Sequence, residues 1–133
     1  MGKNEKPFKM VKLRSMIKNA DAQGIDSTGA NDMRITPIGH FIRSYKLDEL
    51  TQLWNVLKGE MSFIGPRPLL IKYLPMYNNE QRKRHDVKPG ITGLAQVRGY
   101  RGEIEKDSDI LNRIKFDIFY IENWSFFLDI KII

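Results

Sequence analysis

Residues 47–68 constrain the fold of this chain more than any other segment. Leucine and tryptophan recur at three- and four-residue spacing over 47–57, which is the repeat of an amphipathic helix, and Gly59 stands where that helix can end. A Gly-Pro-Arg-Pro segment follows at 65–68, and its two prolines make a stiff corner that a helix cannot continue through. The sequence therefore predicts a helix, its termination and a rigid corner in close succession.

Helical signals recur on both sides of this segment. Thr36 and Pro37 form a helix start, because the threonine hydroxyl can accept a backbone N–H and proline fits the first helical position, so a helix is expected to about Ser44. Apolar residues with helical spacing after Asp107 or Ser108 predict a final helix. Weaker helical patterns occupy two intervening segments, 69–77, where Pro75 interrupts the spacing, and 79–84.

Strand signals are shorter and fewer. Apolar and basic residues alternate over 8–16, the period of a strand with one wet face, and residues 91–97 follow a predicted tight turn at 88–90 as a second short strand. Polar and glycine residues over 19–32 predict a surface loop. Together these patterns predict an α+β fold: one domain dominated by helices, with a few short strands.

Composition narrows the classes of partner. The 133 residues are enough for one domain with its own core, and a formal net charge of +6 with a pI of about 9.6 favours an anionic partner: a nucleotide, a phospholipid head group, an acidic membrane surface or nucleic acid. The absence of cysteine excludes disulfides, a thiolate nucleophile and cysteine-ligated zinc. No apolar run of about 18 residues exists to span a bilayer, and no apolar segment of a signal peptide follows Met1.

Two adjacent acids, Asp48 and Glu49, are the main catalytic candidates. A carboxylate can act as a nucleophile or hold a divalent cation, and the guanidinium of Arg67 has the fork geometry that suits phosphate oxygens. Each has a structural alternative. Acids in the first turn of a helix are favoured by the helix dipole alone, and Arg67 can be the arginine of a structural turn that pairs with a core carboxylate. The residues by themselves leave these alternatives open.

Three other features carry weaker signals. The basic run at 82–84 is either a solvated helix face or a contact with lipid head groups or nucleic acid. His40 and His85 stand alone, without the spacing of metal ligands, and are interpreted as surface or core histidines. Aromatic residues from Tyr120 to Phe127 are core residues by default, although aromatics beside an apolar end also suit a membrane interface.

Taken in order, the motifs resemble one family. The chain is similar to the bacterial sugar transferases, which are monotopic polyprenyl-phosphate phosphoglycosyl transferases. Seven ordered blocks over nearly the whole chain carry this resemblance: KLRSM (12–16), RITPIG (34–39), LDEL (47–50), GEMSFIGPRP (59–68), KPGITG (88–93), QVRGYRGE (96–103) and NWSFFLDIKII (123–133). The GYRGE part of the sixth block resembles the branch of the family that primes exopolysaccharide and capsule synthesis.

This resemblance implies an enzyme that moves a sugar-1-phosphate from a UDP-sugar to undecaprenyl phosphate at the cytoplasmic face of the bacterial inner membrane and releases UMP. That reaction is the first membrane step in assembling exopolysaccharide, capsule or O-antigen. It implies that Asp48 attacks the β-phosphorus of the donor, that Glu49 assists metal or proton handling, and that Mg²⁺ held by Asp48 and Glu49 screens the diphosphate. The substrate-binding residues that the family motifs imply are Lys12, Arg14, Pro66, Arg67, Pro68, Arg98 and Arg101.

The resemblance also sets expectations for domain and partners. Family members carry a membrane-inserted helical hairpin before the point where this chain begins, so residues 1–133 are expected to be a catalytic domain without that hairpin, cut at both ends and soluble or peripheral. The predicted partners are the UDP-sugar, undecaprenyl phosphate and an anionic membrane surface, with no nucleic acid; a homo-oligomer is compatible with the sequence. Residues 82–84 and 124–133 are expected to face the membrane.

The main alternative is a non-catalytic basic module that binds nucleic acid or acidic lipid through Lys9, Lys12, Arg14 and the run at 82–84. Such a module has no need of an acid pair beside a Gly-Pro-Arg-Pro corner, and the chain lacks the alternation of aromatic and basic residues of a base-stacking surface. A catalytically silent scaffold in a glycan-assembly complex is a third alternative, against which the intact acid pair argues. The expectation is therefore a phosphoglycosyl transferase.

Overall fold

The computed structural model of the protein describes residues 1–20, 32–100 and 107–133, with Asp107 described by its backbone only. In chain order the elements, with η for a 3₁₀ helix, are η1 (Lys3–Glu5), α1 (Pro37–Ser44), α2 (Leu47–Leu50), α3 (Leu53–Leu57), β1 (Ser62–Ile64), η3 (Ile71–Met76), α4 (Asn79–Arg82), η4 (Lys83–His85), β2 (Gly90–Thr92), α5 (Leu94–Val97), α6 (Asp107–Glu122) and α7 (Phe126–Ile132). Helices dominate and the described strands form one parallel sheet, so the predicted α+β class is confirmed. Most of the predicted loop at 19–32 lies outside the described residues.

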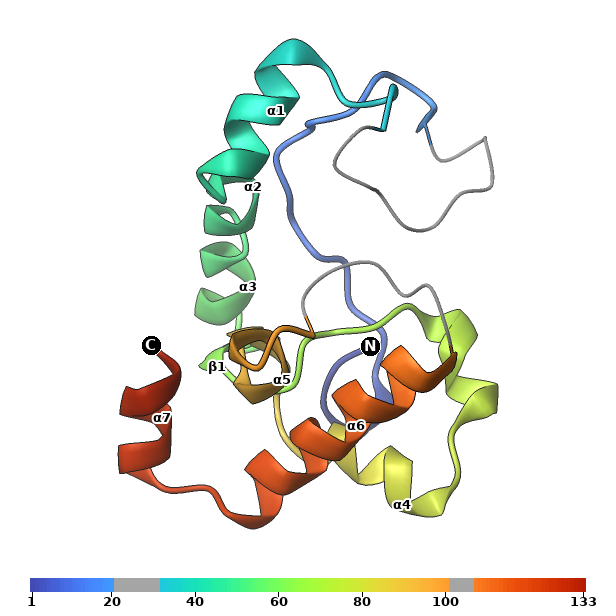
Figure 1. Ribbon diagram of the computed structural model, residues 1–133, viewed down its shortest axis with the longest axis vertical. Coiled ribbons are helices and arrows are strands. Elements are labelled where there is room, and N and C mark those ends of the chain that lie inside the picture. The colour runs from blue at the N-terminus through green and yellow to red at the C-terminus, as the bar shows by residue number, and fades with distance from the viewer. Residues whose placement is uncertain (21–31, 101–106) are drawn as a thin grey trace.

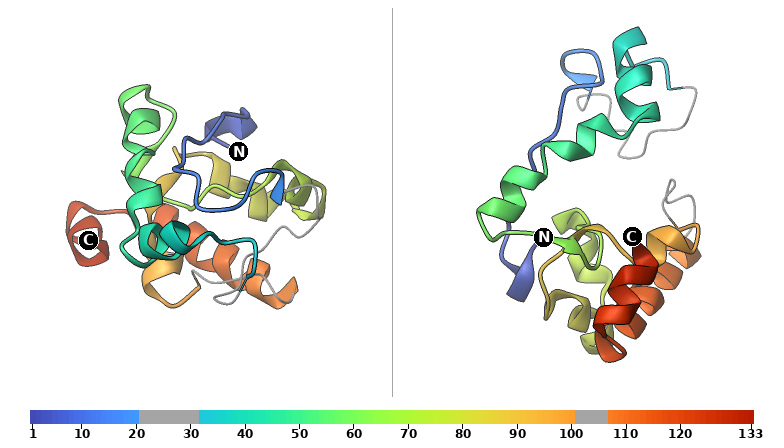
Figure 2. Two further views of the ribbon diagram at one scale, coloured as in Figure 1. Left: turned by 90° about the horizontal axis from the view of Figure 1, so that it is seen from above. Right: turned by 90° about the vertical axis from the view of Figure 1, so that its left-hand side faces the viewer.

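Helices α1, α2 and α3 follow one another as a column along one side of the molecule, and the long helix α6 crosses its lower part (Figure 1). The N-terminal segment runs beside this column, as both further views show (Figure 2). Helix α7 lies at the same side of the molecule as the column (Figure 1). None of the helices in the described ranges is both long enough and apolar enough to cross a bilayer.

The two strands form a small parallel sheet that places the Gly-Pro-Arg-Pro corner. Ser62 of β1 lies opposite Gly90 of β2, and the chain between them passes through η3, α4 and η4. Gly65 N donates to Thr92 O at 3.0 Å, and Gly90 N donates to Pro66 O at 3.0 Å. A Cβ on Gly90 would collide with the backbone nitrogen of Gly65, so this close approach of two backbones requires glycine.

Two apolar clusters form the core around α6. One lies between the end of η3 and α6 and consists of Tyr77, Ile110 and Ile114. The other joins α5, α6 and α7 and consists of Leu94, Tyr120 and Ile132. The predicted final helix, α6, is thus confirmed as the element that both clusters share.

A polar clamp holds α7 onto α6. The hydroxyl of Tyr120 donates to Asp129 Oδ1 at 2.8 Å, and Trp124 Nε1 donates to Asp129 Oδ2 at 3.1 Å. Ser125 caps α7, because its side chain accepts the backbone N–H of Leu128 at 3.2 Å. The short helix α7 therefore has a defined place although many of its side chains are exposed.

A buried ion pair joins α6 to η4. The guanidinium of Arg84 donates to Asp117 Oδ2 from Nε at 3.1 Å and from Nη2 at 2.7 Å, and neither side chain exposes more than 3% of its surface. Nη2 of Arg84 also donates to the backbone carbonyl of Arg67 at 2.8 Å. This pair ties η4, α6 and the corner at 65–68 together.

The predicted helix over 47–57 is confirmed in type, but it turns its polar face inward. It consists of α2 and α3, and Gly59 follows it with a left-handed φ of +77°. Glu49 of α2 and Asn55 of α3 are buried, and so is Gln52, which lies between the two helices in the sequence. The apolar residues of the repeat are exposed instead: Leu50, Leu53, Trp54 and Leu57. An amphipathic helix normally buries its apolar side, so this one leaves an apolar face that the described residues do not cover.

The first predicted strand is wrong. Among the described residues, 8–16 make a single bridge, from Met16 to Ile35, and no strand. The cause is competition for backbone groups: the side chain of Asn55 bonds the N–H of Val11 and the carbonyl of Lys9, which a strand ladder would need.

The second predicted strand and its turn are wrong in extent. Gly90, expected in a tight turn, already belongs to β2, and the strand stops at Thr92. Residues 94–97 are helix α5, because the carbonyl of Gly93 accepts the N–H groups of Gln96 and Val97 at 3.0 and 3.2 Å. The predicted helix at 36–44 is confirmed as α1, with the Thr36 hydroxyl accepting the N–H of Gly39.

Asp117→Asn removes the charge partner of Arg84 and keeps the size of the side chain. Breaking a buried pair from one side leaves an uncompensated buried charge, so we expect the free energy of unfolding to fall by about 3–5 kcal/mol in urea denaturation. Glu80→Gln is the matched control, because it breaks the exposed pair of Lys83 with Glu80 and should leave the denaturation midpoint nearly unchanged. Equal losses in the two variants would contradict the structural importance of the buried pair.

Candidate active site

Asn55 fixes the N-terminal segment against the helices that carry the acids. Its Oδ1 accepts the backbone N–H of Val11 at 3.0 Å, and its Nδ2 donates to the carbonyl of Lys9 at 2.9 Å. Thr51 Oγ1 donates to the carbonyl of Val11 at 3.0 Å. These bonds hold the segment beside α2 and α3, and the next residue along the chain is Lys12.

The acids lie in α2, directly after a left-handed residue, Lys46, with φ +58°. Left-handed backbone is uncommon for a residue with a side chain, and here it lies between α1 and α2. Glu49 exposes only 9% of its surface, whereas Asp48 is half-buried. Asp48 is therefore open to a substrate, and Glu49 faces the interior.

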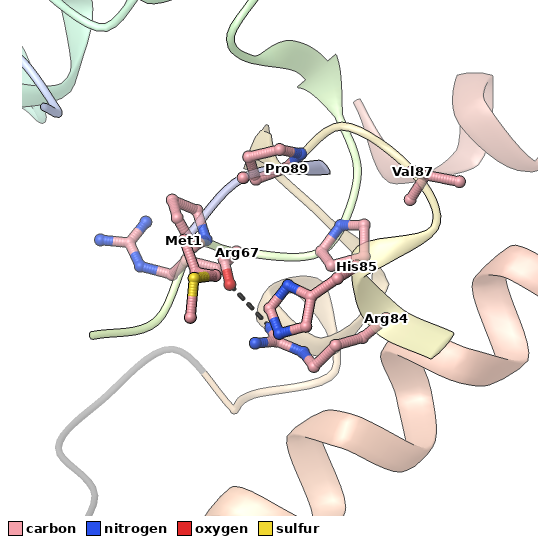
Figure 3. A pocket seen from close by; sticks show the side chains of 9 residues that line it. Met1, Arg67, Arg84, His85, Val87 and Pro89 are labelled. Carbon is pink, nitrogen blue, oxygen red and sulfur yellow. Dashed lines mark hydrogen bonds between the residues drawn. The ribbon is translucent and has the colours of Figure 1, made fainter. Parts of the chain in front are cut away.

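Arg67 reaches Glu49 from the Gly-Pro-Arg-Pro corner. Its Nη2 donates to Glu49 Oε1 at 2.9 Å. The corner is fixed from behind, since the Arg67 carbonyl accepts the bond from Arg84 while the Arg67 guanidinium points away from Arg84 and His85 (Figure 3). Pairing with a buried carboxylate is what the structural alternative predicted. The carboxylate, however, belongs to the candidate catalytic pair, so Arg67 is part of both the fold and the site.

Lys12 lies among charges of both signs. Partial burial lowers its pKa from the ordinary 10.5, the guanidinium of Arg67 lowers this pKa further, and the carboxylates of Asp48 and Glu49 act in the opposite direction. Arg43, on α1, lowers the pKa as well. Because each of these charges is close enough to act on Lys12, four of the residues selected from the sequence gather at one place, and Arg43 joins them.

Arg113 of α6 adds a further cation near Arg67. It is buried, and burial first and then the neighbouring Arg67 lower the pKa of its guanidinium. Repulsion between cations thus acts on both Lys12 and Arg113. The carboxylates that act on Arg113 are Asp109 and Asp117, whereas Lys12, Arg67 and Arg43 lie near the acid pair. These three cations fit a ligand with several negative charges, and they reduce the repulsion that a phosphate would meet from Asp48.

A groove of about 490 Å³ is lined by residues 12–20 and by Arg43. Arg43 Nε donates to Ser15 Oγ at 2.9 Å and fixes one wall. Arg14, selected from the sequence, is exposed and lines this groove. The charged residues that line this groove are therefore all cationic, and one of them, Lys12, lies near the acid pair.

The remaining residues selected from the sequence lie at different places. Pro66 is buried and Pro68 half-buried on either side of Arg67, where they shape the corner. Arg98 is exposed at the end of α5, and no hydrogen bond or ion pair within the described ranges joins it to the cluster. Arg101 lies outside the described residues.

Sequence reasoning missed Arg43, Asn55 and Arg113. Asn55 had a detectable signal, because a polar residue between Trp54 and Val56 interrupts an apolar repeat. The two arginines had none, since a single arginine on a helix is ordinary.

The basic run at 82–84 is not a free cationic surface. Its three cations pair with carboxylates: Arg82 with Glu5, Lys83 with Glu80, and Arg84 with Asp117. The run therefore supplies little of the positive charge that was expected to face an anionic membrane. The reason lies in the tertiary structure, which brings acids from distant segments to two of these three side chains.

The acid pair suits a divalent cation that is shared with a substrate. Within residues 1–20, 32–100 and 107–133, no three His, Cys, Asp or Glu side chains gather into a metal site. Asp48 and Glu49 offer two adjacent carboxylates, of which Glu49 already accepts a bond from Arg67. Mg²⁺ is commonly held by one or two carboxylates together with substrate phosphates and water. The residues present fit that arrangement and not a closed protein cage.

Similarity to known proteins extends over the whole chain. Residues 1–133 match the family model described as bacterial sugar transferase. The chain is 46% identical over 132 residues to an uncharacterized sugar transferase, EpsL, of Bacillus subtilis (strain 168), covering 99% of this chain and 62% of that protein. It is 44% identical over 135 residues to the UDP-glucose:undecaprenyl-phosphate glucose-1-phosphate transferase of Klebsiella pneumoniae, covering 99% and 29%.

A third relative is the UDP-N-acetylgalactosamine-undecaprenyl-phosphate N-acetylgalactosaminephosphotransferase of Aeromonas hydrophila, 40% identical over 137 residues and covering 100% of this chain and 32% of that protein. The chain spans less than two thirds of the length of each of these relatives. The chain is thus similar to one part of each of these longer proteins.

Asn55→Ala should release the N-terminal segment from α3. The Val11 N–H loses its acceptor, so we expect faster hydrogen exchange in peptides that contain Val11, together with a loss of about 1–3 kcal/mol in the free energy of unfolding. Asn123→Ala is the matched control, because Asn123 is exposed and its side chain, among the residues that the structure describes, bonds within its own turn to Phe119 O. Wild-type protection at Val11 in the Asn55 variant would show that this bond does not hold the segment.

His85 should make stability depend on pH. Burial first, and the charge of Arg84 second, lower the pKa of His85 from 6.5 to about 4. The unfolded chain takes up this proton near pH 6.5 and the folded protein only near pH 4, so stability is complete above pH 6.5 and is lost as pH falls through this window. His85→Gln should flatten that loss by up to about 1.4 kcal/mol per pH unit in denaturation curves. The exposed His40→Gln control should keep the wild-type slope, and a shared change in slope would contradict the assignment.

Proposed function

Since the chain belongs to the bacterial sugar transferase family, we propose that it transfers a sugar-1-phosphate from a UDP-sugar to undecaprenyl phosphate and releases UMP. The names of two relatives describe this reaction with different sugars, glucose and N-acetylgalactosamine. The proposal is therefore made for UDP-sugars as a class. The observation that carries it is the gathering of Lys12, Arg43 and Arg67 around the acid pair.

In the first step, a carboxylate oxygen of Asp48 attacks the β-phosphorus of the donor. An oxygen–phosphorus bond forms, the bond from the β-phosphorus to the bridging oxygen of the diphosphate breaks, and UMP leaves with the bonding electron pair. The product is a phosphosugar ester of Asp48. A carboxylate meets strong repulsion from a diphosphate, and Lys12 and Arg67 lie where they reduce it.

In the second step, a phosphate oxygen of undecaprenyl phosphate attacks the same phosphorus. The bond from phosphorus to Asp48 breaks, and the carboxylate is restored. Glu49 is held in one orientation by Arg67 and serves in proton or metal handling. Asp48 and Glu49 would hold Mg²⁺, which supplies charge neutralisation at the diphosphate when it is bound.

We place this reaction at the cytoplasmic face of the bacterial inner membrane, as the first membrane step in assembling exopolysaccharide, capsule or O-antigen. Exposed apolar and aromatic side chains on α2, α3, β1 and α7 support this location, because such residues suit a membrane interface. They are Leu50, Trp54, Leu57, Phe63, Phe126 and Phe127. Because the cations at 82–84 are paired with acids, the proposed contact with the membrane rests more on this apolar surface than on positive charge.

The non-catalytic basic module finds no support. Two of the basic features it relied on are engaged in the fold or the site: the run at 82–84 is paired with acids, and Lys12 lies beside the acid pair. No relative reported above is named for binding nucleic acid.

Asp48→Asn tests the proposed nucleophile. An amide neither attacks phosphorus nor carries the charge that holds Mg²⁺, so we expect UMP release and the labelled phosphosugar intermediate to fall together, by about 10³-fold or more. The exposed Asp86→Asn is the matched control and should keep both. Wild-type UMP release by the Asp48 variant would remove this residue from the mechanism.

A further inference from the structure

An apolar groove opens beside the acid pair. It has a volume of about 440 Å³ and is lined by residues of α2, α3, both strands and the end of α7. Its charged lining residues are Lys46 and Glu49. Most of the remaining lining is aliphatic or aromatic and includes Leu53, Phe63 and Ile91.

The polar part of this groove coincides with the candidate active site. Glu49 lines the groove and also accepts the bond from Arg67. Lys46 is exposed and stands three residues before Glu49, at the left-handed turn into α2. A ligand in the groove therefore has one end beside Lys46 and the ion pair of Glu49 with Arg67, and the rest of its length against apolar side chains.

This chemistry selects an amphiphile with one anionic end. A nucleotide or a free sugar would find few hydrogen-bonding groups along Leu53, Phe63 and Ile91, and burying its polar groups there would cost free energy. A hydrocarbon chain would instead remove its own apolar surface and that of the groove from water. The cationic groove at Lys12 and Arg43 is the better place for a nucleotide.

The groove is also continuous with the exposed apolar face of α2 and α3. Leu50 lines the groove and is 57% exposed, so it belongs to both surfaces. Trp54 and Leu57 extend the same face beyond the groove. Exposed apolar side chains therefore lead from the face of α2 and α3 into the groove.

We propose that this groove binds the first isoprene units of the polyprenyl phosphate acceptor, with the phosphate directed towards Lys46 and Arg67. The identity of the acceptor rests on the proposed function; the preference for an apolar chain with an anionic end rests on the groove itself. Leu53, Phe63 and Ile91 are then the residues that select the prenyl chain. The docking of an amphipathic helix in the same groove is the competing outcome.

Photolabelling tests the occupant directly. A farnesyl phosphate with a photoreactive group on its prenyl chain, irradiated with the protein in the absence of donor, should label Leu53, Phe63 or Ile91. Unlabelled farnesyl phosphate should suppress this labelling at much lower concentration than butyl phosphate, which shares the head group but not the chain. Labelling elsewhere, or equal competition by the two phosphates, would overturn the proposal.

A pair of matched variants gives the second readout. Leu53→Asn places a polar side chain in the groove, and we expect the KM for farnesyl phosphate to rise about tenfold, because apolar burial is lost. Leu111→Asn makes the same change at an exposed position of α6 outside the groove, and its KM should stay at the wild-type value. Equal effects of both variants, or a Leu53→Asn change in oligomeric state without a change in KM, would overturn the proposal.

The donor step separates this inference from the proposed function. UMP released from a UDP-sugar without acceptor reports the chemistry at Asp48 alone. If the wild type releases UMP but the groove is not labelled, the proposed function is supported and the groove is not the acceptor site. If the groove is labelled but no UDP-sugar tested yields UMP, the lipid site is supported and the proposed reaction is contradicted.

Discussion

The ion pair between Arg84 and Asp117 is the interaction on which the arrangement of the site depends. Removing two charges from water costs several kcal/mol per ion unless the remaining donors are also used. Arg84 uses a spare N–H for the carbonyl of Arg67, so its burial is compensated only when the Gly-Pro-Arg-Pro corner lies where it does. The guanidinium of Arg67 is thereby directed to Glu49, and one buried pair sets α6, η4 and the corner together.

The inward polar face of α2 and α3 is the second constraint. Glu49 needs Arg67, and Asn55 needs the backbone of the N-terminal segment, because buried polar groups without partners are costly. Satisfying these groups leaves Leu50, Trp54 and Leu57 outside. The exposed apolar face is thus the consequence of an interior committed to a polar site, and it is where a lipid substrate and a membrane would meet the protein.

The site also contains two locally unfavourable features that a purely structural region would avoid. Cations crowd together near Arg67, and Lys46 has a left-handed backbone at the entrance to α2. Backbone strain and close cations of this kind persist where the surrounding structure holds them and where a ligand can relieve them. A phosphate-rich donor would neutralise the crowded cations, which gives the arrangement a functional reason.

The sequence by itself determined the helices at 36–44 and 107–122, the corner at 65–68 and the acid pair, because capping residues, apolar periodicity and proline act locally. It also carried the family motifs that brought Lys12 and Arg67 into the argument. It could not show that residues 8–16 give their hydrogen bonds to Asn55, that Arg43 and Arg113 join the site, or that the helix at 47–57 faces inward with its polar side. Only the tertiary structure decided these points, since each depends on which distant partner satisfies a charge or a backbone group.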